Sequence, residues 1–184
     1  MRPAAIIVMG VSGSGKSTIG ALLAEKLGWP FADADGFHPA ANVAKMASGQ
    51  PLTDADRWPW LEAIAAHIAT ARQAAQPVVV ACSALRRAYR ERLRAGHDDL
   101  LFLHLAGAPE VIAKRQAARQ GHFMPPSLMA SQFATLEDPA AEADAVTISV
   151  LASPHEVVAA ALEHLAQGGP TPPISTRSRS DGII

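Results

Sequence analysis

Cysteine is almost absent from this sequence, since Cys82 is the single one among 184 residues. One cysteine cannot close a disulfide within the chain, which excludes a disulfide-stapled secreted domain and fits a reducing compartment. Long apolar runs are missing too. None approaches the ~20 residues that a membrane-spanning helix needs, and the run after Arg2 is too short for a secretory signal. We therefore expect a cytoplasmic protein with no membrane partner.

An excess of charge of either sign is also lacking, because 16 Lys and Arg face 17 Asp and Glu, for a formal net charge of -1. Aromatic residues make up only 5% of the chain. Nucleic-acid binding usually needs a positive field and exposed aromatic rings, so we expect small-molecule partners and no nucleic acid. The length and the 49% of hydrophobic residues suit one domain with a sizeable core.

The most informative stretch is GVSGSGKS at residues 10–17, which follows an apolar run and precedes a segment of helical periodicity. Glycine, four free positions, a second glycine, lysine and a hydroxyl residue, placed between a strand and a helix, form the pattern of a phosphate-binding P-loop. Backbone N–H groups cradle the phosphates, the lysine reaches the β- and γ-phosphates, and the hydroxyl holds Mg²⁺. The residues expected to bind ATP here are Gly10, Val11, Ser12, Gly13, Ser14, Gly15, Lys16, Ser17 and Thr18.

Short apolar runs alternate with helical segments along the rest of the chain, which predicts an α/β fold with a parallel sheet. Strands are predicted at residues 4–9, 31–33, 77–82, 100–105 and 145–150. Helices are predicted at 16–27, 39–48, after the cap Thr53, at 86–94, from Pro109 onward, around 128–136 and at 154–166.

Three finer expectations concern packing. In the second predicted helix, Val43 and Met46 are expected to face inward. Trp58 and Trp60 are interpreted as packing residues and not as stacking platforms for a ligand. The arginine-rich helix 86–94 is expected to present a solvated basic face.

Two carboxylates, Asp33 and Asp35, stand at the end of the second predicted strand. If the strand geometry continues, residues two apart project the same way, into the crevice where doubly wound folds bind ligands. A polar turn with Asp35 and Gly36 at its corner is the alternative. Beside a P-loop the functional interpretation is favoured, because phosphoryl transfer needs one carboxylate near Mg²⁺ and one to accept a hydroxyl proton. Which carboxylate takes which role stays open.

Several single polar residues have two interpretations. His38 and Arg57 are candidate contacts to a polyhydroxy or anionic substrate, or else solvated surface groups. Ser83, at a strand end, is a candidate contact to substrate or to Mg²⁺-bound water, or else a strand cap. Arg115 and Arg119 share one helix face before a reversal marked by glycine and proline. That pattern predicts a lid whose arginines neutralise charge on the transferred group.

Together these motifs resemble one known family, the small bacterial-type gluconokinases, which are P-loop kinases related in fold to shikimate kinase and more distantly to adenylate kinase. The matching stretches are GVSGSGKS at 10–17, DADGFHP at 33–39, KMASGQPLTDADRWPWL at 45–61, CSALRRAYRERLR at 82–94 and GHFMPPSLMASQFATLE at 121–137. They cover most of residues 5–165. The second and third are far more specific than the P-loop and separate gluconokinases from their relatives.

The resemblance implies ATP-dependent phosphorylation of D-gluconate at its terminal hydroxyl, giving 6-phosphogluconate for the pentose phosphate or Entner-Doudoroff route. It also implies a P-loop NTPase fold with a five-stranded parallel sheet flanked by helices, a helical substrate-binding segment at about 39–60, a lid at about 115–130 and a homodimer. We expect a single kinase domain over residues 1–167. The low-complexity tail 168–184 is expected to be disordered.

Site residues are carried over position by position. The residues assigned to catalysis are Lys16, Asp35 and Arg119, with Asp35 as the general base. Ser17 and Asp33 are assigned to Mg²⁺, and Arg115 joins the P-loop in binding ATP. The residues expected to bind gluconate are Asp33, Asp35, His38, Arg57, Ser83, Arg86 and Gln132.

Three other functions share parts of this pattern. A kinase for another small acid, such as shikimate, would keep the P-loop and lack the second and third stretches. A nucleoside monophosphate kinase would accept a nucleotide instead. A non-catalytic nucleotide-binding module would need no acceptor site, so the aspartates and arginines that line the predicted acceptor site argue against it.

Overall fold

The strand β1, Ala5–Met9, lies at the centre of a five-stranded sheet in a computed structural model that describes residues 3–117 and 126–167. The strand order is β2-β3-β1-β4-β5, and every pairing is parallel. The other strands are β2 Phe31–Asp33, β3 Val78–Ala81, β4 Leu100–Ala106 and β5 Ala145–Ser149. The predicted α/β fold with a five-stranded parallel sheet is confirmed.

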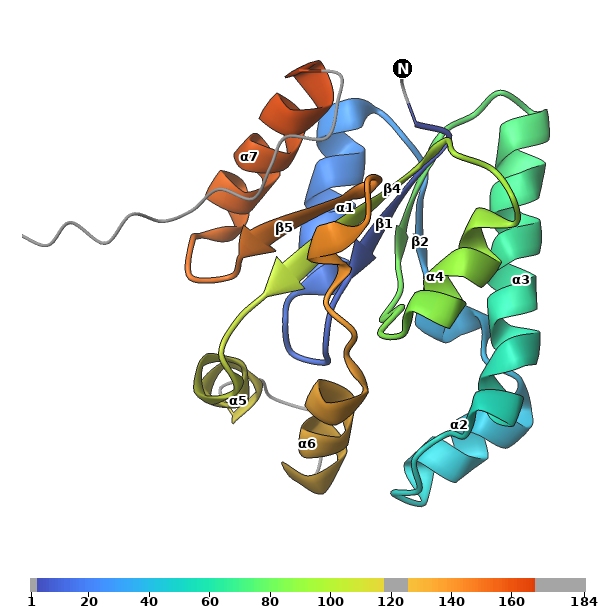
Figure 1. Cartoon of the computed structure of the whole chain (residues 1–184), viewed down its shortest axis with the longest axis vertical. Coiled ribbons are helices and arrows are strands. Elements are labelled where there is room, and N and C mark those ends of the chain that lie inside the picture. Colours follow the sequence, from blue (N-terminus) through green and yellow to red (C-terminus); the bar gives the residue numbers. More distant parts are fainter. Residues whose placement is uncertain (1–2, 118–125, 168–184) are drawn as a thin grey trace, which may run out of the picture.

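Helices cover both faces of the sheet (Figure 1). The helices are α1 Lys16–Leu27, α2 Ala40–Ala47, α3 Asp54–Gln73, α4 Arg87–Arg94, α5 Pro109–Ala117, α6 Pro126–Thr135 and α7 Pro154–Gln167. The short 3-10 helices are η1 Ala34–Phe37 and η2 Pro139–Ala141. Within the described residues, no helix has the length and apolar character that would let it cross a membrane.

All five residues of β1 are fully buried, because each face of the sheet packs against its own pair of helices. Ile6 and Val8 belong to a core cluster with residues of α1 and α7, whereas Ile7 and Met9 belong to a second cluster with residues of α3 and α4. Side chains alternate between the two faces of a strand. The continuous apolar run of β1 therefore supplies both cores at once, as expected for a parallel strand.

The three central strands end close to one another, since Val8 pairs with Ala81 at the end of β3, and Met9 pairs with His104, two residues before the end of β4. Figure 1 shows α2, α5 and α6 gathered at the end of the molecule toward which the strands point. The loops that follow the strands emerge at this same edge. In parallel α/β sheets, this carboxyl edge is where ligands bind.

The short helix α2 faces the opposite way from the prediction. Val43 is 50% exposed and Met46 is 39% exposed, whereas Asn42 is buried. The Asn42 side-chain amide donates to the backbone carbonyl of Asp56 at 2.8 Å, which ties α2 to the first turn of α3. The expectation that Val43 and Met46 face inward is wrong, because this tertiary hydrogen bond decides which side of α2 is covered.

The two tryptophans of α3 pack differently from each other. Trp60 is 3% exposed, and its indole N–H donates to the backbone carbonyl of Ala34 at 2.7 Å. Trp58 is 39% exposed and meets the ring of Tyr89 edge-on, with 5.8 Å between the ring centroids. Packing is therefore the role of Trp60, while Trp58 is only half covered.

The arginine-rich helix α4 is not solvated throughout, because the Arg90 side chain is fully buried. Its guanidinium donates to the Glu142 carboxylate and to the backbone carbonyls of Ala84, Leu85 and Glu137. These bonds join the loop after β3 to the segment that follows α6. The expectation of a solvated basic face is wrong at this position, since the buried cation is fully paired.

We predict that Arg90→Ala lowers the free energy of unfolding by about 3–5 kcal/mol, because it removes one of the two arginines that pair with Glu142 and leaves several buried carbonyls without their donor. Urea denaturation measures the change. Arg87→Ala is the control: its side chain is 69% exposed and pairs with Glu91 one turn away, so it should cost no more than about 0.5 kcal/mol. Equal losses in the two variants would contradict a structural role for the buried network.

Candidate active site

The P-loop, residues 10–17, joins the end of β1 to the start of α1. Gly13 and Gly15 have φ values of 84° and 96°, a left-handed backbone that other residues adopt only with strain. The helix α1 begins at Lys16, and its N-cap residue makes no side-chain capping hydrogen bond. The first N–H groups of the helix and the positive end of its dipole therefore face the loop, which is the geometry that binds phosphate.

Asp33 lies against the last residue of the P-loop, because the Ser17 hydroxyl donates to Asp33 Oδ2 at 2.6 Å. Hydroxyl and carboxylate oxygens are the ligands that Mg²⁺ prefers, and in kinases one or two carboxylates act together with substrate phosphates. No group of three or more His, Cys, Asp or Glu side chains in the described parts of the chain could hold a metal. Ser17 and Asp33 thus fit a Mg²⁺ ion that arrives with a nucleotide.

Asp35 does not extend the strand that ends at Asp33. The chain turns there into η1, and Asp33 caps this 3-10 helix by accepting the backbone N–H of Asp35 at 3.1 Å. The expectation that strand geometry continues and projects both carboxylates the same way is wrong. A single capping hydrogen bond directs Asp33 toward α1 and leaves Asp35 on the first turn of η1.

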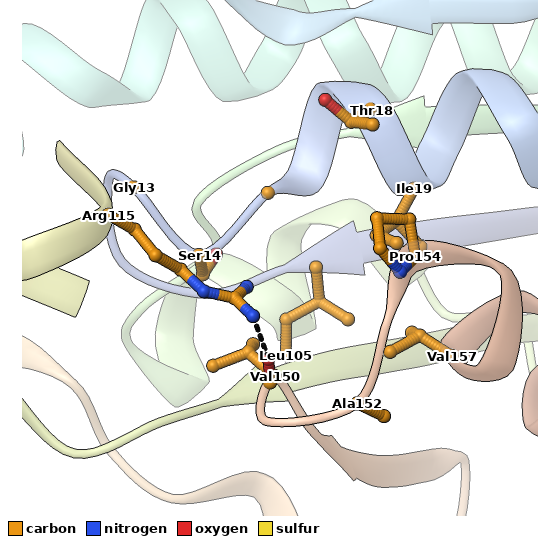
Figure 2. Close-up of a pocket in the computed structure, with 11 residues that line it drawn as sticks. Gly13, Ser14, Thr18, Ile19, Leu105, Arg115, Val150, Ala152, Pro154 and Val157 are labelled. Carbon is orange, nitrogen blue, oxygen red and sulfur yellow. Dashed lines mark hydrogen bonds between the residues drawn. The ribbon is translucent and has the colours of Figure 1, made fainter. Parts of the chain in front are cut away.

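A cavity of about 230 Å³ opens beside the P-loop (Figure 2). Arg115 reaches across it from α5 and donates to the backbone carbonyl of Val150, in the loop between β5 and α7. The residues that line the cavity are Gly13, Ser14, Gly15, Thr18, Ile19, Leu105, Arg115, Val150, Ala152, Pro154 and Val157. Apolar walls with a guanidinium on one side suit a flat heteroaromatic ring, held next to the loop that binds its phosphates.

His38 lies flat on the indole of Trp60, with 4.4 Å between the ring centroids and 10° between the planes. Its Nδ1 is 3.4 Å from the side-chain nitrogen of Asn42. Burial is the main cause that lowers the pKa of His38, while the Asp35 carboxylate opposes the shift and the Arg57 guanidinium adds to it. The imidazole is therefore neutral near pH 7, and it can exchange hydrogen bonds with a hydroxyl group without adding charge.

Arg57 and Arg86 come from different elements and meet around Asp54. Arg86 Nη1 donates to Asp54 Oδ2 at 2.8 Å, and Arg57 Nη1 lies 3.8 Å from Asp54 Oδ1. Arg57 Nη1 also donates to the backbone carbonyl of Leu52 at 2.6 Å. The structure thus brings together two of the predicted substrate-binding arginines, beside η1 and α2.

The P-loop is contacted from outside by two glutamines. Gln132 of α6 accepts the backbone N–H of Ser12 at 2.6 Å through its Oε1, and Gln116 of α5 donates to the Ser12 hydroxyl at 2.9 Å. Gln132 was expected beside gluconate, and here its amide oxygen lies on the phosphate loop. Gln116 was not predicted, because no local pattern distinguishes it from a surface glutamine.

Residues 12–166 match the profile of the shikimate kinase family. A probable gluconokinase of Mus musculus is 47% identical over 182 residues, which cover 89% of this chain and 98% of that protein. The chain belongs to the gluconokinase family. A gluconokinase of Gluconobacter oxydans is 43% identical over 164 residues, covering 89% of this chain and 92% of that protein. The crystal structure of a gluconokinase from Sinorhizobium meliloti superposes with a TM-score of 0.84 at 48% identity, over 91% of this chain and 94% of that one.

Membership of the gluconokinase family confirms the resemblance inferred from the five motifs. Gluconokinases and shikimate kinases are phosphotransferases that use a nucleotide, so the predicted enzyme class is confirmed as well. The family does not by itself assign individual residues. The roles of the predicted site residues stay predictions, which the geometry of each position supports to a different degree.

Ser83 lies at the P-loop, since its backbone carbonyl accepts the N–H of Gly10 at 3.3 Å. Cys82, beside it, is fully buried, and burial raises the pKa of its thiol to about 12, as suits a small packing residue. Arg119, residues 118–125 of the predicted lid and the tail 168–184 lie outside the described residues.

The loop between β5 and α7 was missed by sequence reasoning, although Val150, Ala152 and Pro154 form one wall of the cavity beside the P-loop. The only local signal was a proline at the start of a helix that follows the last strand. Its relevance depends on β5 lying next to β4 in the sheet, which the sequence pattern does not specify.

We predict that Ala152→Trp weakens ATP binding by about 10-fold or more, because an indole would occupy the space that suits the nucleotide base. Isothermal titration with a non-hydrolysable ATP analogue measures the change. Leu151→Trp is the control, since the neighbouring Leu151 is 74% exposed and does not line the cavity. Unchanged affinity in a folded Ala152→Trp protein would mean that the base binds elsewhere.

Proposed function

We propose that this chain is a gluconokinase that transfers the γ-phosphoryl group of ATP, with Mg²⁺, to the terminal hydroxyl of D-gluconate. The observation that carries the proposal is a group of polar side chains beside the P-loop, which we call the acceptor segment. It consists of Asp33, Asp35, His38, Arg57 and Arg86. The relatives that share 43–48% identity and nearly the whole length are named gluconokinases. The product is 6-phospho-D-gluconate, and we further propose that it feeds the pentose phosphate or Entner-Doudoroff route.

The acceptor segment has the chemistry that an aldonate requires. Gluconate carries one carboxylate and five hydroxyl groups, so it needs cations at one end and neutral hydrogen-bonding groups along its length. Arg57 and Arg86 supply the cations, and arginine is well suited to carboxylates because its donors form a planar fork. Neutral His38 and the carboxylates of Asp33 and Asp35 supply partners for hydroxyl groups.

His38 links the acceptor segment to the phosphate side of the site. The charges of Asp35 and of Arg57 both act on its imidazole. The charges of Lys16, Asp33 and Asp35 likewise all act on Cys82, which directly follows β3 and donates its backbone N–H to the carbonyl of Val8 in β1. These influences on His38 and Cys82 support the proposal that Asp35, the predicted general base, acts close to both the phosphate-binding and the acceptor-binding residues.

In the mechanism that we propose, the P-loop N–H groups and Lys16 hold the phosphates, and Ser17 with Asp33 would hold Mg²⁺. Bound there, Mg²⁺ neutralises negative charge on the phosphates. The terminal hydroxyl oxygen of gluconate bonds to the γ-phosphorus, and Asp35 accepts the proton of that hydroxyl group. The bond from that phosphorus to the β,γ-bridging oxygen breaks, and ADP leaves. Most of the rate enhancement then comes from positioning and charge stabilisation.

Several finer features of the proposal rest on the family resemblance. We propose that ATP binds with its base in the cavity between Arg115 and Pro154, and that Arg119 contributes to charge stabilisation. We also propose a cytoplasmic homodimer whose kinase domain spans residues 1–167.

The proposed reaction is tested by an assay that couples ADP release to NADH oxidation, with ATP and Mg²⁺ and one acceptor at a time. We expect turnover with D-gluconate and only background with shikimate, AMP or no acceptor. Turnover with shikimate or AMP but not with gluconate would keep the kinase and overturn the substrate. ATP binding without transfer to any acceptor would favour a non-catalytic module.

Asp33 and Asp35 can be separated by two isosteric variants. We predict that Asp35→Asn lowers kcat by a factor on the order of 10² to 10⁴ because the base is lost, with ATP affinity and Mg²⁺ requirement little changed. Asp33→Asn should instead raise the Mg²⁺ concentration for half-maximal rate by about 10-fold or more.

Initial rates across a Mg²⁺ titration measure both effects. The hydrogen bond that caps η1 is accepted by Asp33, and the amide oxygen of Asp33→Asn can still accept it. We therefore expect η1 to persist in both variants, and circular dichroism checks that it does. Exchanged outcomes, with Mg²⁺ dependence altered by Asp35→Asn, would reverse the two assignments.

A further inference from the structure

The Asp54 carboxylate lies between the two arginines that we propose as carboxylate-binding groups. Asp54 is the first residue of α3, and its side chain is 43% exposed. Arg86 Nη1 donates to its Oδ2 at 2.8 Å. Its other oxygen accepts the hydroxyl of Tyr89 and lies 3.8 Å from Arg57 Nη1. One acidic group from α3 therefore contacts cations from both α3 and the start of α4.

Tyr89 contacts all three members of the cluster formed by Asp54, Arg57 and Arg86. Its side chain is buried, and the guanidinium carbons of Arg57 and Arg86 lie 5.6 Å and 6.0 Å from its ring centroid. Its hydroxyl donates to Asp54 and lies 3.4 Å from Arg57 Nη1, which donates to it. Burial raises the pKa of Tyr89, and the hydrogen bond to Asp54 raises it further, so the phenol stays protonated as a donor.

Two guanidinium groups at such a site repel each other and have many side-chain rotamers. Arg57 and Arg86 are 23% and 42% exposed, so solvent leaves them room to move apart. A shared carboxylate cancels the repulsion and fixes both planar forks, which lowers the entropy lost when they bind a substrate carboxylate. Asp54 itself need not touch the substrate to have this effect.

We propose that Asp54 is a positioning residue, which holds Arg57 and Arg86 in place for the carboxylate of the acceptor and so sets the preference for an anionic over an uncharged polyol. The inference rests on the proposed function, because it assumes that these arginines bind gluconate. It assigns the carboxylate end of the acceptor to the α3–α4 junction. The hydroxyl to be phosphorylated then lies toward Asp35.

A second ion pair between the same two helices serves as a control, because it bridges α3 and α4 without contacting the proposed substrate-binding arginines. Glu62 of α3 pairs with Arg92 of α4, in the same two helices as Asp54 and Arg86. Those two side chains are 53% and 38% exposed. They contact neither Tyr89 nor a second arginine through any bond recorded for the described residues. Glu62→Gln thus makes the same chemical change without touching the arginine pair.

The test compares wild type, Asp54→Asn, Tyr89→Phe and Glu62→Gln, with D-gluconate as substrate and D-gluconamide as an uncharged competitive inhibitor. For Asp54→Asn we expect the KM for gluconate to rise about 10-fold or more, as for loss of a charge-assisted hydrogen bond. The inhibition constant of gluconamide, the KM for ATP and kcat should change by less than about 3-fold. Tyr89→Phe should raise the KM for gluconate in the same direction, and Glu62→Gln should change nothing.

Each other result would overturn the proposal. Equal weakening of gluconate and gluconamide would mean that Asp54 only maintains local structure, and an unchanged KM would mean that it has no part in binding. A lower KM for gluconate would mean that Asp54 competes with the substrate for the arginines. Wild-type protein that does not phosphorylate gluconate would refute the proposed function instead, before any variant is compared.

Discussion

Because β1 pairs in parallel with both β3 and β4, the loops that follow these three strands all begin at the same edge of the sheet. The P-loop follows β1, Asp33 closes β2, and Ser83 follows β3. The hydrogen bond from the Gly10 N–H to the Ser83 carbonyl continues this alignment one step beyond the strands. Groups that are tens of residues apart in sequence therefore meet beside the N-terminus of α1, and the proposed phosphate, metal and acceptor sites all depend on this geometry.

The arginines of the α4 region illustrate how burial separates structural from functional charge. Arg90 is fully buried, and carbonyls and the Glu142 carboxylate satisfy its donors, so it can bind nothing else. Arg86, four residues earlier, is 42% exposed and shares a single carboxylate with Arg57. Removing the partner of a buried charge is costly, whereas an exposed pair adds little stability. The exposed pair is therefore the one that we propose for binding the substrate carboxylate.

The helices α5 and α6 connect the phosphate loop with the cavity proposed for the base. Gln116 and Gln132 contact Ser12 on the outer side of the P-loop, and Arg115, next to Gln116 in α5, reaches the wall of the cavity formed by Val150. The same helix would thus support both ends of the nucleotide in the binding mode that we propose. A change in how α5 packs would alter phosphate and base binding together.

The amino-acid sequence by itself determined the features that depend on neighbours in the chain. The P-loop, the bounds of α1, the capping of α3 by Thr53 and the buried strands follow from local spacing and side-chain chemistry, and the motifs identified the family. The candidate substrate-binding residues His38, Arg57 and Arg86 were also predicted in this way, since each stands in a motif.

Only the tertiary structure decided features that depend on distant partners. Asn42 is buried because it reaches the Asp56 carbonyl, and Arg90 is buried because Glu142, 52 residues away, supplies a carboxylate. The contact of Tyr89 with Asp54 spans 35 residues. Periodicity can indicate which face of a helix is apolar. Periodicity does not give the position of a partner on another element. Such a partner lowers the free-energy cost of burying a charged or polar group, and it also fixes the orientation of that group in a site.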